Sequence, residues 1–304
     1  MSETSYRRMQ DLPSTHLLGS GTAMCAGCGG LHAVQEIHDV LGPKTVFVNA
    51  AGCMTMLSVY PFTPFRGSWL YTSMASAPAG AQGVRDALDL LVAKGRIPPE
   101  EDLEVVVLAG DGSSCGMGLA ATSGAIDRGL DFVYVCYDNE GYANTGQQSS
   151  AATPHAARTA TSSRAGGFPG EKKDLFAIWA ANRPAYVATA IAAEPVDLAR
   201  KLEKARGLVG PRLLLVLAPC PTGWGFDPSE SVEIGRLAVG TGIWPLKEWQ
   251  AGKVTYTKVR RPRLSVERYL ERQERFRHLF EPVRDEATLA GIQARVDDAW
   301  RGIE

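Results

Sequence analysis

Aspartate and asparagine side chains follow two strand-like segments at the points where these segments end. Asp111 comes directly after the strand-like residues 105–110. Asn139 comes at the end of the next strand-like run, which covers residues 132–137. A small-residue helix between the two makes them parallel neighbours, whose carboxyl ends meet at one edge of a sheet. Mg²⁺ prefers oxygen ligands, so these two side chains and a backbone carbonyl such as that of Gly141 can hold one ion. The spacing therefore predicts a magnesium site with phosphate as a co-ligand.

The residues around Asp111 add features suited to a diphosphate. They read Gly110-Asp111-Gly112-Ser113-Ser114, and the two glycines let the backbone approach an anion closely. The helix that opens near Ser114 points its backbone N–H groups at that charge. The structural alternative is a glycine-rich turn followed by an Asx-turn, as in many α/β proteins. The motif resembles the thiamine diphosphate motif, and by that resemblance Asp111, Asn139 and Gly141 are the Mg²⁺ ligands.

Six cysteines give a second, independent signal. Cys25 and Cys28 form a CxxC pair, while Cys53 and Cys220 each follow a β-rich run, so the sheet can deliver them to the same edge. Four thiolates converging there would fit either a [4Fe–4S] cluster or an all-cysteine zinc site, and spacing alone does not separate these. A thioredoxin-like redox pair is another interpretation of CxxC, but it needs no distant cysteines. The pattern predicts a metal centre and leaves its identity open.

Several motifs occur in one order along nearly the whole chain, from about residue 17 to residue 300. They are Cys25-Ala-Gly-Cys28-Gly29, Gly52-Cys53, Asp111, the run from Tyr142 to Pro154, Lys172-Lys173-Asp174, and Pro219-Cys220-Pro-Thr-Gly-Trp-Gly225. In this order they resemble the beta subunit of 2-oxoacid:ferredoxin oxidoreductases, most closely the pyruvate:ferredoxin oxidoreductase group.

This resemblance implies that the chain binds thiamine diphosphate and one [4Fe–4S] cluster. The cysteines that match its cluster ligands are Cys25, Cys28, Cys53 and Cys220, which favours iron–sulfur over zinc. Cys115 and Cys136 match no ligand position, and we interpret them as small apolar residues near the sheet. The implied partners are an alpha subunit, a ferredoxin-like subunit with further clusters, and ferredoxin, so we expect a hetero-oligomer.

Together the two sites predict oxidative decarboxylation of a 2-oxoacid to acyl-coenzyme A and CO2. The thiamine ring stores the electron pair that CO2 leaves behind, and a cluster at the same edge would remove electrons one at a time. A thiamine-dependent lyase with a structural zinc site and a non-catalytic assembly subunit are the alternatives. The sequence offers no convincing glutamate to activate the aminopyrimidine. In the family the alpha subunit supplies it, so we expect an active site shared between subunits.

Two stretches after the third cysteine depart from the pattern of pyruvate-specific members. Those members tend to carry Thr-Pro-Tyr-Pro and Trp-Ile-His-Ala-Phe-Glu-Asn, whereas this chain has Ser58-Val-Tyr-Pro-Phe62 and Trp69-Leu-Tyr-Thr-Ser-Met-Ala-Ser76. The missing histidine and Glu-Asn pair leave the substrate open among pyruvate, an aryl acid such as phenylglyoxylate, a branched 2-oxoacid and oxalate.

Strand-like and helix-like segments alternate through the chain and predict an α/β fold with a mostly parallel, doubly wound sheet, the thiamine diphosphate-binding fold. Strands are expected at 45–50, 103–109, 132–137, 186–190 and 212–218, and helices at 30–41, 76–94, 115–128, 174–181 and 195–208. From about residue 251 we expect a strand-poor arm with two charged helices. We therefore divide the chain into a cofactor-binding domain, 1–250, and a docking arm, 251–304.

The segment 140–172 lacks clear periodicity, and a loop of this length in a compact domain often binds a ligand. Asn144 and Thr145, just beyond the metal-binding turn, are expected nearest the cofactor and are weak candidates for catalytic residues. His155 and Arg158 are candidates for contact with an anionic substrate or coenzyme A. A flexible surface loop is the alternative.

Residues 253–277 carry nine Lys or Arg against three Glu. Tyr269, Leu270 and Phe276 are expected to share one face of a helix over 265–276, whose other face is charged. We interpret this segment as a docking helix for a partner subunit rather than a nucleic-acid site.

Composition agrees with this picture. The chain has 304 residues, 45% of them hydrophobic, and a formal net charge of −1, so it can build a large core and shows no overall bias toward nucleic acid or a bilayer. It contains no run of about eighteen apolar residues and no secretory pattern. Free cysteines that ligate metal suit a reducing compartment, so we expect a cytoplasmic protein without a membrane partner.

Overall fold

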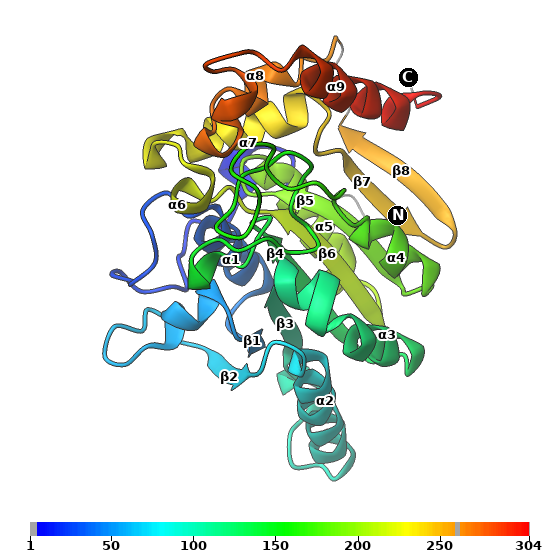
Figure 1. Ribbon diagram of the computed structural model, residues 1–304. Helices are drawn as coiled ribbons and strands as arrows, with labels where there is room; N and C mark the ends of the chain where they lie inside the picture. The colour runs from blue at the N-terminus through cyan, green and yellow to red at the C-terminus, as the bar shows by residue number, and fades with distance from the viewer. Residues whose placement is uncertain (1–4, 259–261, 304) are drawn as a thin grey trace.

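The computed structural model describes residues 5–258 and 262–303 (Figure 1). Its centre is an eight-stranded sheet in the order β2-β1-β3-β4-β6-β5-β7-β8. The first six strands in this order run parallel, while β7 lies antiparallel to β5 and β8 antiparallel to β7. The strands are β1 Thr45–Ala50, β2 Ser68–Thr72, β3 Glu104–Gly110, β4 Phe132–Asp138, β5 Tyr186–Ile191, β6 Pro211–Leu217, β7 Leu246–Gln250 and β8 Lys253–Lys258. The predicted mostly parallel sheet is confirmed.

Helices cover both faces of the sheet. They are α1 Gly29–Leu41, α2 Ala77–Ala93, α3 Leu119–Asp127, α4 Leu175–Ala181, α5 Pro195–Arg206, α6 Pro221–Trp224, α7 Ser231–Gly240, α8 Glu267–Leu270 and α9 Glu286–Trp300. Helices α1 and α5 pack on one face, and α2, α3, α4, α7 and α9 pack on the other. Each face of the sheet has its own hydrophobic core. Alternate residues of β6 pack into these two cores, Leu215 on one face and Leu214 on the other. This is the doubly wound arrangement that near-continuous hydrophobic strands favour.

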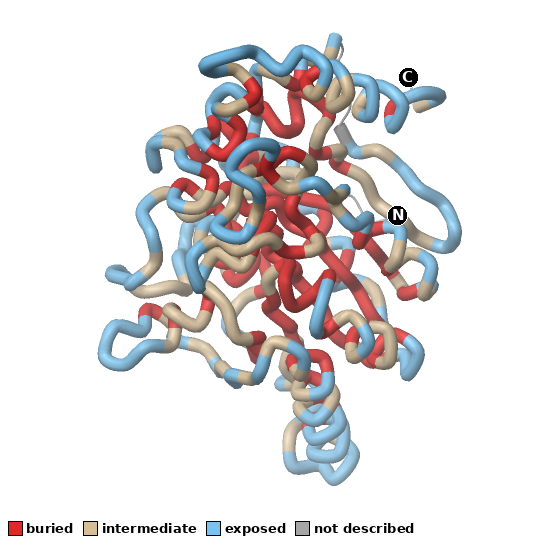
Figure 2. The backbone as a smooth tube through the Cα atoms, viewed as in Figure 1, coloured by how far each residue is buried: buried red, intermediate tan, exposed pale blue. Residues whose placement is uncertain are grey.

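Burial is concentrated along the central strands, as Figure 2 shows. Every residue of β4 and β6 is buried, whereas β2 at the sheet edge is largely exposed. The turns that follow the parallel strands lie together at the carboxyl edge of the sheet. The candidate site residues lie in these turns. Among the helices that the structure describes, none is long and apolar enough to cross a membrane.

The C-terminal segment differs from the expectation. Residues 253–258 form β8, which pairs with β7, so the proposed boundary at residue 250 falls inside a hairpin. The division into two domains stays a prediction. The single helix expected over 265–276 is wrong, because this segment forms α8 and then the 3-10 helix η7 Glu274–Leu279. Part of the basic run, residues 259–261, lies outside the described residues.

The apolar face of that segment packs inside the chain. Tyr269, Leu270 and Phe276 are each at most 3% exposed and belong to the core on the α7 side of the sheet. The expected docking face is therefore wrong for these side chains, since this chain already covers them. An amphipathic pattern predicts that the apolar face of a helix is buried. It does not indicate whether the same chain or a partner protein covers that face.

Candidate cofactor and cluster site

Three oxygen-bearing groups meet where β3 and β4 end. The two strands are parallel neighbours with Gly110 opposite Tyr137, so Asp111 and Asn139 follow at adjacent positions. One terminal atom of the Asn139 amide lies 2.8 Å from the carbonyl oxygen of Gly141 and 3.0 Å from Asp111 Oδ1. Without a metal, that atom is a nitrogen that donates to both oxygens. With a cation, it is an oxygen that completes a set of three ligands, so this donor set fits Mg²⁺.

Asp111 is fully buried and lies near the carboxylates of Asp138 and Glu140. Burial and the nearby carboxylate of Asp138 raise the pKa of Asp111 to about 8. The hydroxyl of Ser150 donates a hydrogen bond to Asp111 Oδ2, and no Lys or Arg of the described ranges forms an ion pair with it. An ionised carboxylate in such a place is unfavourable unless a cation compensates its charge.

A cavity of about 140 Å³ opens beside these groups. Its lining contains the following residues predicted from the sequence: Gly110, Asp111, Gly112, Asn139, Gly141, Asn144 and Thr145. The side chains of Ser113 and Ser114 point elsewhere. The Ser113 hydroxyl donates to the carbonyl of Met74, and that of Ser114 donates to the carbonyl of Gly110 at 2.9 Å. Only the backbone N–H groups of these two serines remain candidates for phosphate contact.

All four cysteines of the predicted ligand set line a second cavity of about 440 Å³. Cys28 caps α1, where its sulfur accepts from Leu31 N at 3.4 Å, and Cys220 caps α6, where its sulfur accepts from Gly223 N at 3.3 Å. Cys53 begins the 3-10 helix η2 Cys53–Ser58 after β1. The Gly29 N–H donates to the Pro219 carbonyl at 3.0 Å, which ties the CxxC segment to the Cys220 segment.

The thiols are close enough to influence one another. Burial raises the pKa of Cys53 to about 12, with smaller contributions from the charges of Cys220, Cys28 and Cys25. Burial likewise raises the pKa of Cys220 to about 11, again with contributions from Cys28 and Cys25. Within residues 5–258 and 262–303, however, no three Cys, His, Asp or Glu side chains are arranged to hold a single metal ion. The four thiols line a shared cavity and do not converge on one ion position. The cluster therefore stays a prediction.

The two cavities are neighbours. Cys53, Asn139, Ala143 and Asn144 line both of them. The other terminal atom of the Asn139 amide lies 3.9 Å from the Cys53 sulfur. A group held by the oxygens and a group held by the sulfurs would therefore lie side by side at the same sheet edge. Cys115 and Cys136 are buried and line neither cavity, as their interpretation as apolar residues predicts.

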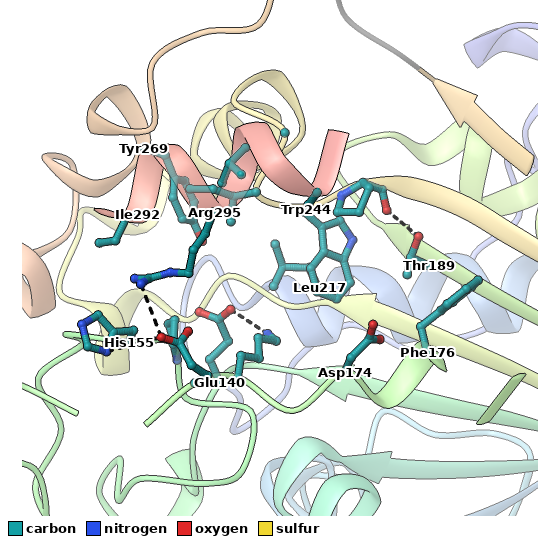
Figure 3. A pocket seen from close by; sticks show the side chains of 18 of the residues that line it. Glu140, His155, Asp174, Phe176, Thr189, Leu217, Trp244, Tyr269, Ile292 and Arg295 are labelled. Atoms are coloured by element: carbon teal, nitrogen blue, oxygen red, sulfur yellow. Dashed lines mark hydrogen bonds and ion pairs between the residues drawn. The ribbon is translucent and has the colours of Figure 1, made fainter. Parts of the chain in front are cut away.

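A third cavity, of about 410 Å³, lies beneath α9, on the face of the sheet that α4 and α7 also cover (Figure 3). Leu217, Trp244 and Ile292 form part of its apolar wall, while Arg295 reaches across its mouth to Glu171 at 3.5 Å. His155 lines this cavity and not the cofactor cavity. Arg158 lines none of the three cavities, and its backbone N–H donates to the Arg275 carbonyl at 2.9 Å. Neither residue lies at the cofactor cavity, and their contact with an anionic substrate or coenzyme A stays a prediction.

Sequence reasoning missed the charged groups that support the site. Glu140, Lys172 and Arg275 are linked by ion pairs behind the turn at 139–141. Lys172 stands in a motif of the family resemblance, but neither its role nor that of Arg275 is visible in local spacing. Part of the segment 140–172 packs against the site. Its Ser150 contacts Asp111, and its Thr153 hydroxyl donates to the Glu140 carbonyl at 2.9 Å.

Known proteins resemble this chain in sequence and in fold. The family model of the C-terminal TPP-binding domain of thiamine pyrophosphate enzymes matches residues 50–216. Pyruvate synthase subunit PorB of Methanosarcina barkeri is 43% identical over 94% of this chain and 95% of that protein. PorB of Thermotoga maritima is 36% identical over 92% and 89%, respectively. The ketoisovalerate oxidoreductase subunit VorB of Pyrococcus horikoshii is 36% identical over 86% and 85%.

Among solved structures, the 2-oxoglutarate:ferredoxin oxidoreductase of Magnetococcus marinus matches with a TM-score of 0.57 and 21% identity, over 95% of this chain and 98% of that one. At this identity the match supports the fold alone. The curated relatives, by contrast, are similar enough over enough of their length to establish kinship. The chain belongs to the family of 2-oxoacid:ferredoxin oxidoreductase beta subunits that includes pyruvate synthase subunit PorB, as its motifs predicted.

Proposed function

We propose that this chain is the subunit that binds thiamine diphosphate, Mg²⁺ and one [4Fe–4S] cluster in a hetero-oligomeric 2-oxoacid:ferredoxin oxidoreductase. The observation that carries the proposal is the adjacency of two cavities, one gathering oxygen ligands and the other four cysteines, which share Asn139 and Cys53. Their junction is the 3.9 Å approach between the Asn139 amide and the Cys53 sulfur.

Residues of this chain are suited to hold each group. Asp111, Asn139 and the Gly141 carbonyl would ligate Mg²⁺, and the backbone from Gly110 to Ser114 with Asn144 would contact the diphosphate. Cys25, Cys28, Cys53 and Cys220 would ligate the cluster. When bound, thiamine diphosphate supplies an electron sink for decarboxylation, and an iron–sulfur cluster supplies one-electron oxidation.

The chain's own residues set the conditions for that chemistry. Burial of Asp111 and Asn139 excludes water from the ion's protein ligands, which strengthens their electrostatic effect. The cysteine cavity is predominantly apolar, with Met24, Met54 and Met56 in its lining. Cys25 is exposed while the other three cysteines are partly buried, so an electron-accepting partner would approach the cluster most closely at this end of the cavity.

We assign pyruvate as the first substrate to test, because relatives named pyruvate synthase share up to 44% identity with this chain. A branched 2-oxoacid is the second substrate to test, because one relative is a ketoisovalerate oxidoreductase subunit. Phenylglyoxylate and oxalate are the remaining substrates to test. Acyl-coenzyme A would be the product. The described lining of the smaller cavity includes no glutamate, which supports an alpha subunit as the source of the activating carboxylate.

The remaining partners are a ferredoxin-like subunit and ferredoxin, in the cytoplasm. The test is anaerobic purification of the complex with its partner subunits, followed by iron and sulfide analysis, electron paramagnetic resonance and 2-oxoacid-dependent dye reduction. We expect iron and acid-labile sulfide on this chain, and turnover with coenzyme A that this chain alone does not support. A colourless chain containing zinc would favour the lyase alternative.

A further inference from the structure

The turn that carries Asn139 and Gly141 is held from behind by a residue from the far end of the chain. Arg275 Nη2 lies 2.6 Å from Glu140 Oε2. Glu140 stands between Asn139, whose amide lies 3.0 Å from Asp111 Oδ1, and Gly141, whose carbonyl oxygen lies 2.8 Å from the same amide. Glu140 has a φ of +63°, a left-handed conformation that an L residue keeps only where its surroundings enforce it. Glu140 and Arg275 are each 4% exposed, so the pair is shielded from solvent.

Arg275 reaches the same turn by a second route. Its guanidinium carbon is 3.9 Å from the centre of the Trp224 ring. Trp224 Nε1 donates a 2.8 Å hydrogen bond to the backbone carbonyl of Asn139. A planar guanidinium can pair with a carboxylate while it stacks on an indole, whereas a lysine ammonium presents only a compact charge. Arg275 therefore fixes both Glu140 and the residue before it.

The charges in this network balance without Asp111. Lys172 Nζ lies 2.7 Å from Asp138 Oδ2 and 2.7 Å from Glu140 Oε1. Together with Arg275, two bases thus face two acids. Arg275 does not neutralise Asp111, and the charge of that carboxylate stays available to a cation.

We propose that Arg275 is a positioning residue for the divalent-cation site. It holds the Asn139 amide and the Gly141 carbonyl toward Asp111 and does not itself touch the ion. The proposal rests on the proposed function, and it adds a residue that lies 135 positions from Glu140 in the sequence. Loss of such a supporting contact behind a metal ligand typically weakens metal binding by about 10- to 100-fold.

The test is calorimetric titration of Mg²⁺, in the presence of thiamine diphosphate, into the complete complex carrying Arg275→Lys. Lysine keeps the charge but cannot pair with Glu140 and stack on Trp224 together. We expect the apparent Kd for Mg²⁺ to rise by about 10- to 100-fold, with kcat close to the wild-type value at saturating Mg²⁺. Arg277→Lys is the matched control, because Arg277 lies on the same η7 and, among the described residues, its ion pairs are with the exposed Glu274 and Glu281. It should leave the Kd unchanged.

Partial unfolding would lower the number of sites per complex and leave the Kd of the remaining sites unchanged, so titration separates the two effects. If Arg275→Lys does not assemble, Glu140→Gln removes the ion pair with Arg275 from the other side, together with the pair to Lys172, and should raise the Kd at least as much. Wild-type Mg²⁺ affinity in an assembled variant overturns this proposal and leaves the proposed function intact. A wild-type complex that binds neither Mg²⁺ nor thiamine diphosphate overturns both.

Discussion

The ring of Tyr142 lies directly against Gly112, so closely that a Cβ on this glycine would stand 2.2 Å from Tyr142 Cε1. Both residues line the smaller cavity. A side chain at position 112 would therefore collide with the Tyr142 ring. This is a second reason for glycine here, besides the close approach of an anion that the motif predicts.

Gly112→Ala should displace the Tyr142 ring and distort the smaller cavity. Overpacking of this kind costs about 1–3 kcal/mol, which corresponds to roughly a 5- to 150-fold loss of affinity if the strain is relieved into the cavity. We expect weaker thiamine diphosphate binding in calorimetric titration. Gly83→Ala is the control, since nothing lies within 4 Å of its added Cβ, and it should leave binding unchanged.

Substitution of a predicted cluster ligand should reduce iron content, whereas substitution of another cysteine should not. We expect Cys53→Ser to lose the cluster signal in electron paramagnetic resonance and most of the iron bound by this chain. Cys115→Ala should retain both, because Cys115 is buried away from the cysteine cavity. Equal iron in the two variants would remove Cys53 from the ligand set.

Removal of the cation should abolish the stabilisation that the cofactor provides. A ligand at a hundred times its Kd stabilises the folded state by about 2.7 kcal/mol, so Mg²⁺ with thiamine diphosphate should raise the Tm. A chelator should reverse this rise. Asp111→Asn should prevent it, because the amide leaves the ion without its one carboxylate ligand in the set of Asp111, Asn139 and Gly141. A Tm rise in Asp111→Asn equal to that of the wild type would contradict the assignment.

Glu36 on α1 should make the stability of the chain depend on pH. Burial, then the charges of Asp39 and Asp197, raise the pKa of this carboxyl from 4.5 to about 9. The folded state therefore binds more protons than the unfolded state between these values, and the free energy of unfolding falls as pH rises through that window.

The substitution that tests this is Glu36→Gln. At pH 8 the variant should be more stable than the wild type, while near pH 4 the two should be similar. The measurement is the Tm as a function of pH. Glu233→Gln, at an exposed position of α7, should keep the wild-type profile. A Glu36→Gln profile parallel to that of the wild type would show that Glu36 is ionised in the folded chain.

Sequence reasoning located the parallel core well, because the strands around Asp111 and Asn139 are long hydrophobic runs that end in recognisable turns. Neighbouring parallel strands then bring those two residues together without further information. The edge strands were missed for a physical reason. β2 exposes most of its residues and β7 buries only Leu246 fully, so neither shows the hydrophobic run of a central strand.

The supporting network could not be read from the sequence. Arg275 and Glu140 are far apart in the chain, and a basic residue between charged neighbours is usually solvated. Only the packing of η7 against α6, where Glu274 N donates to the Gly225 carbonyl at 3.0 Å, brings Arg275 inward. Tyr269 was misassigned for the related reason that its burial partner lies in the same chain.

The order of the four cysteines along the polypeptide has a consequence for biosynthesis. Cys220 follows β6, the last of the parallel strands to be made, while the other three thiols precede the third strand. A ribosome must therefore make the first 220 of the 304 residues before the last sulfur can join the others, so delivery of the proposed cluster to this subunit would follow translation of its core.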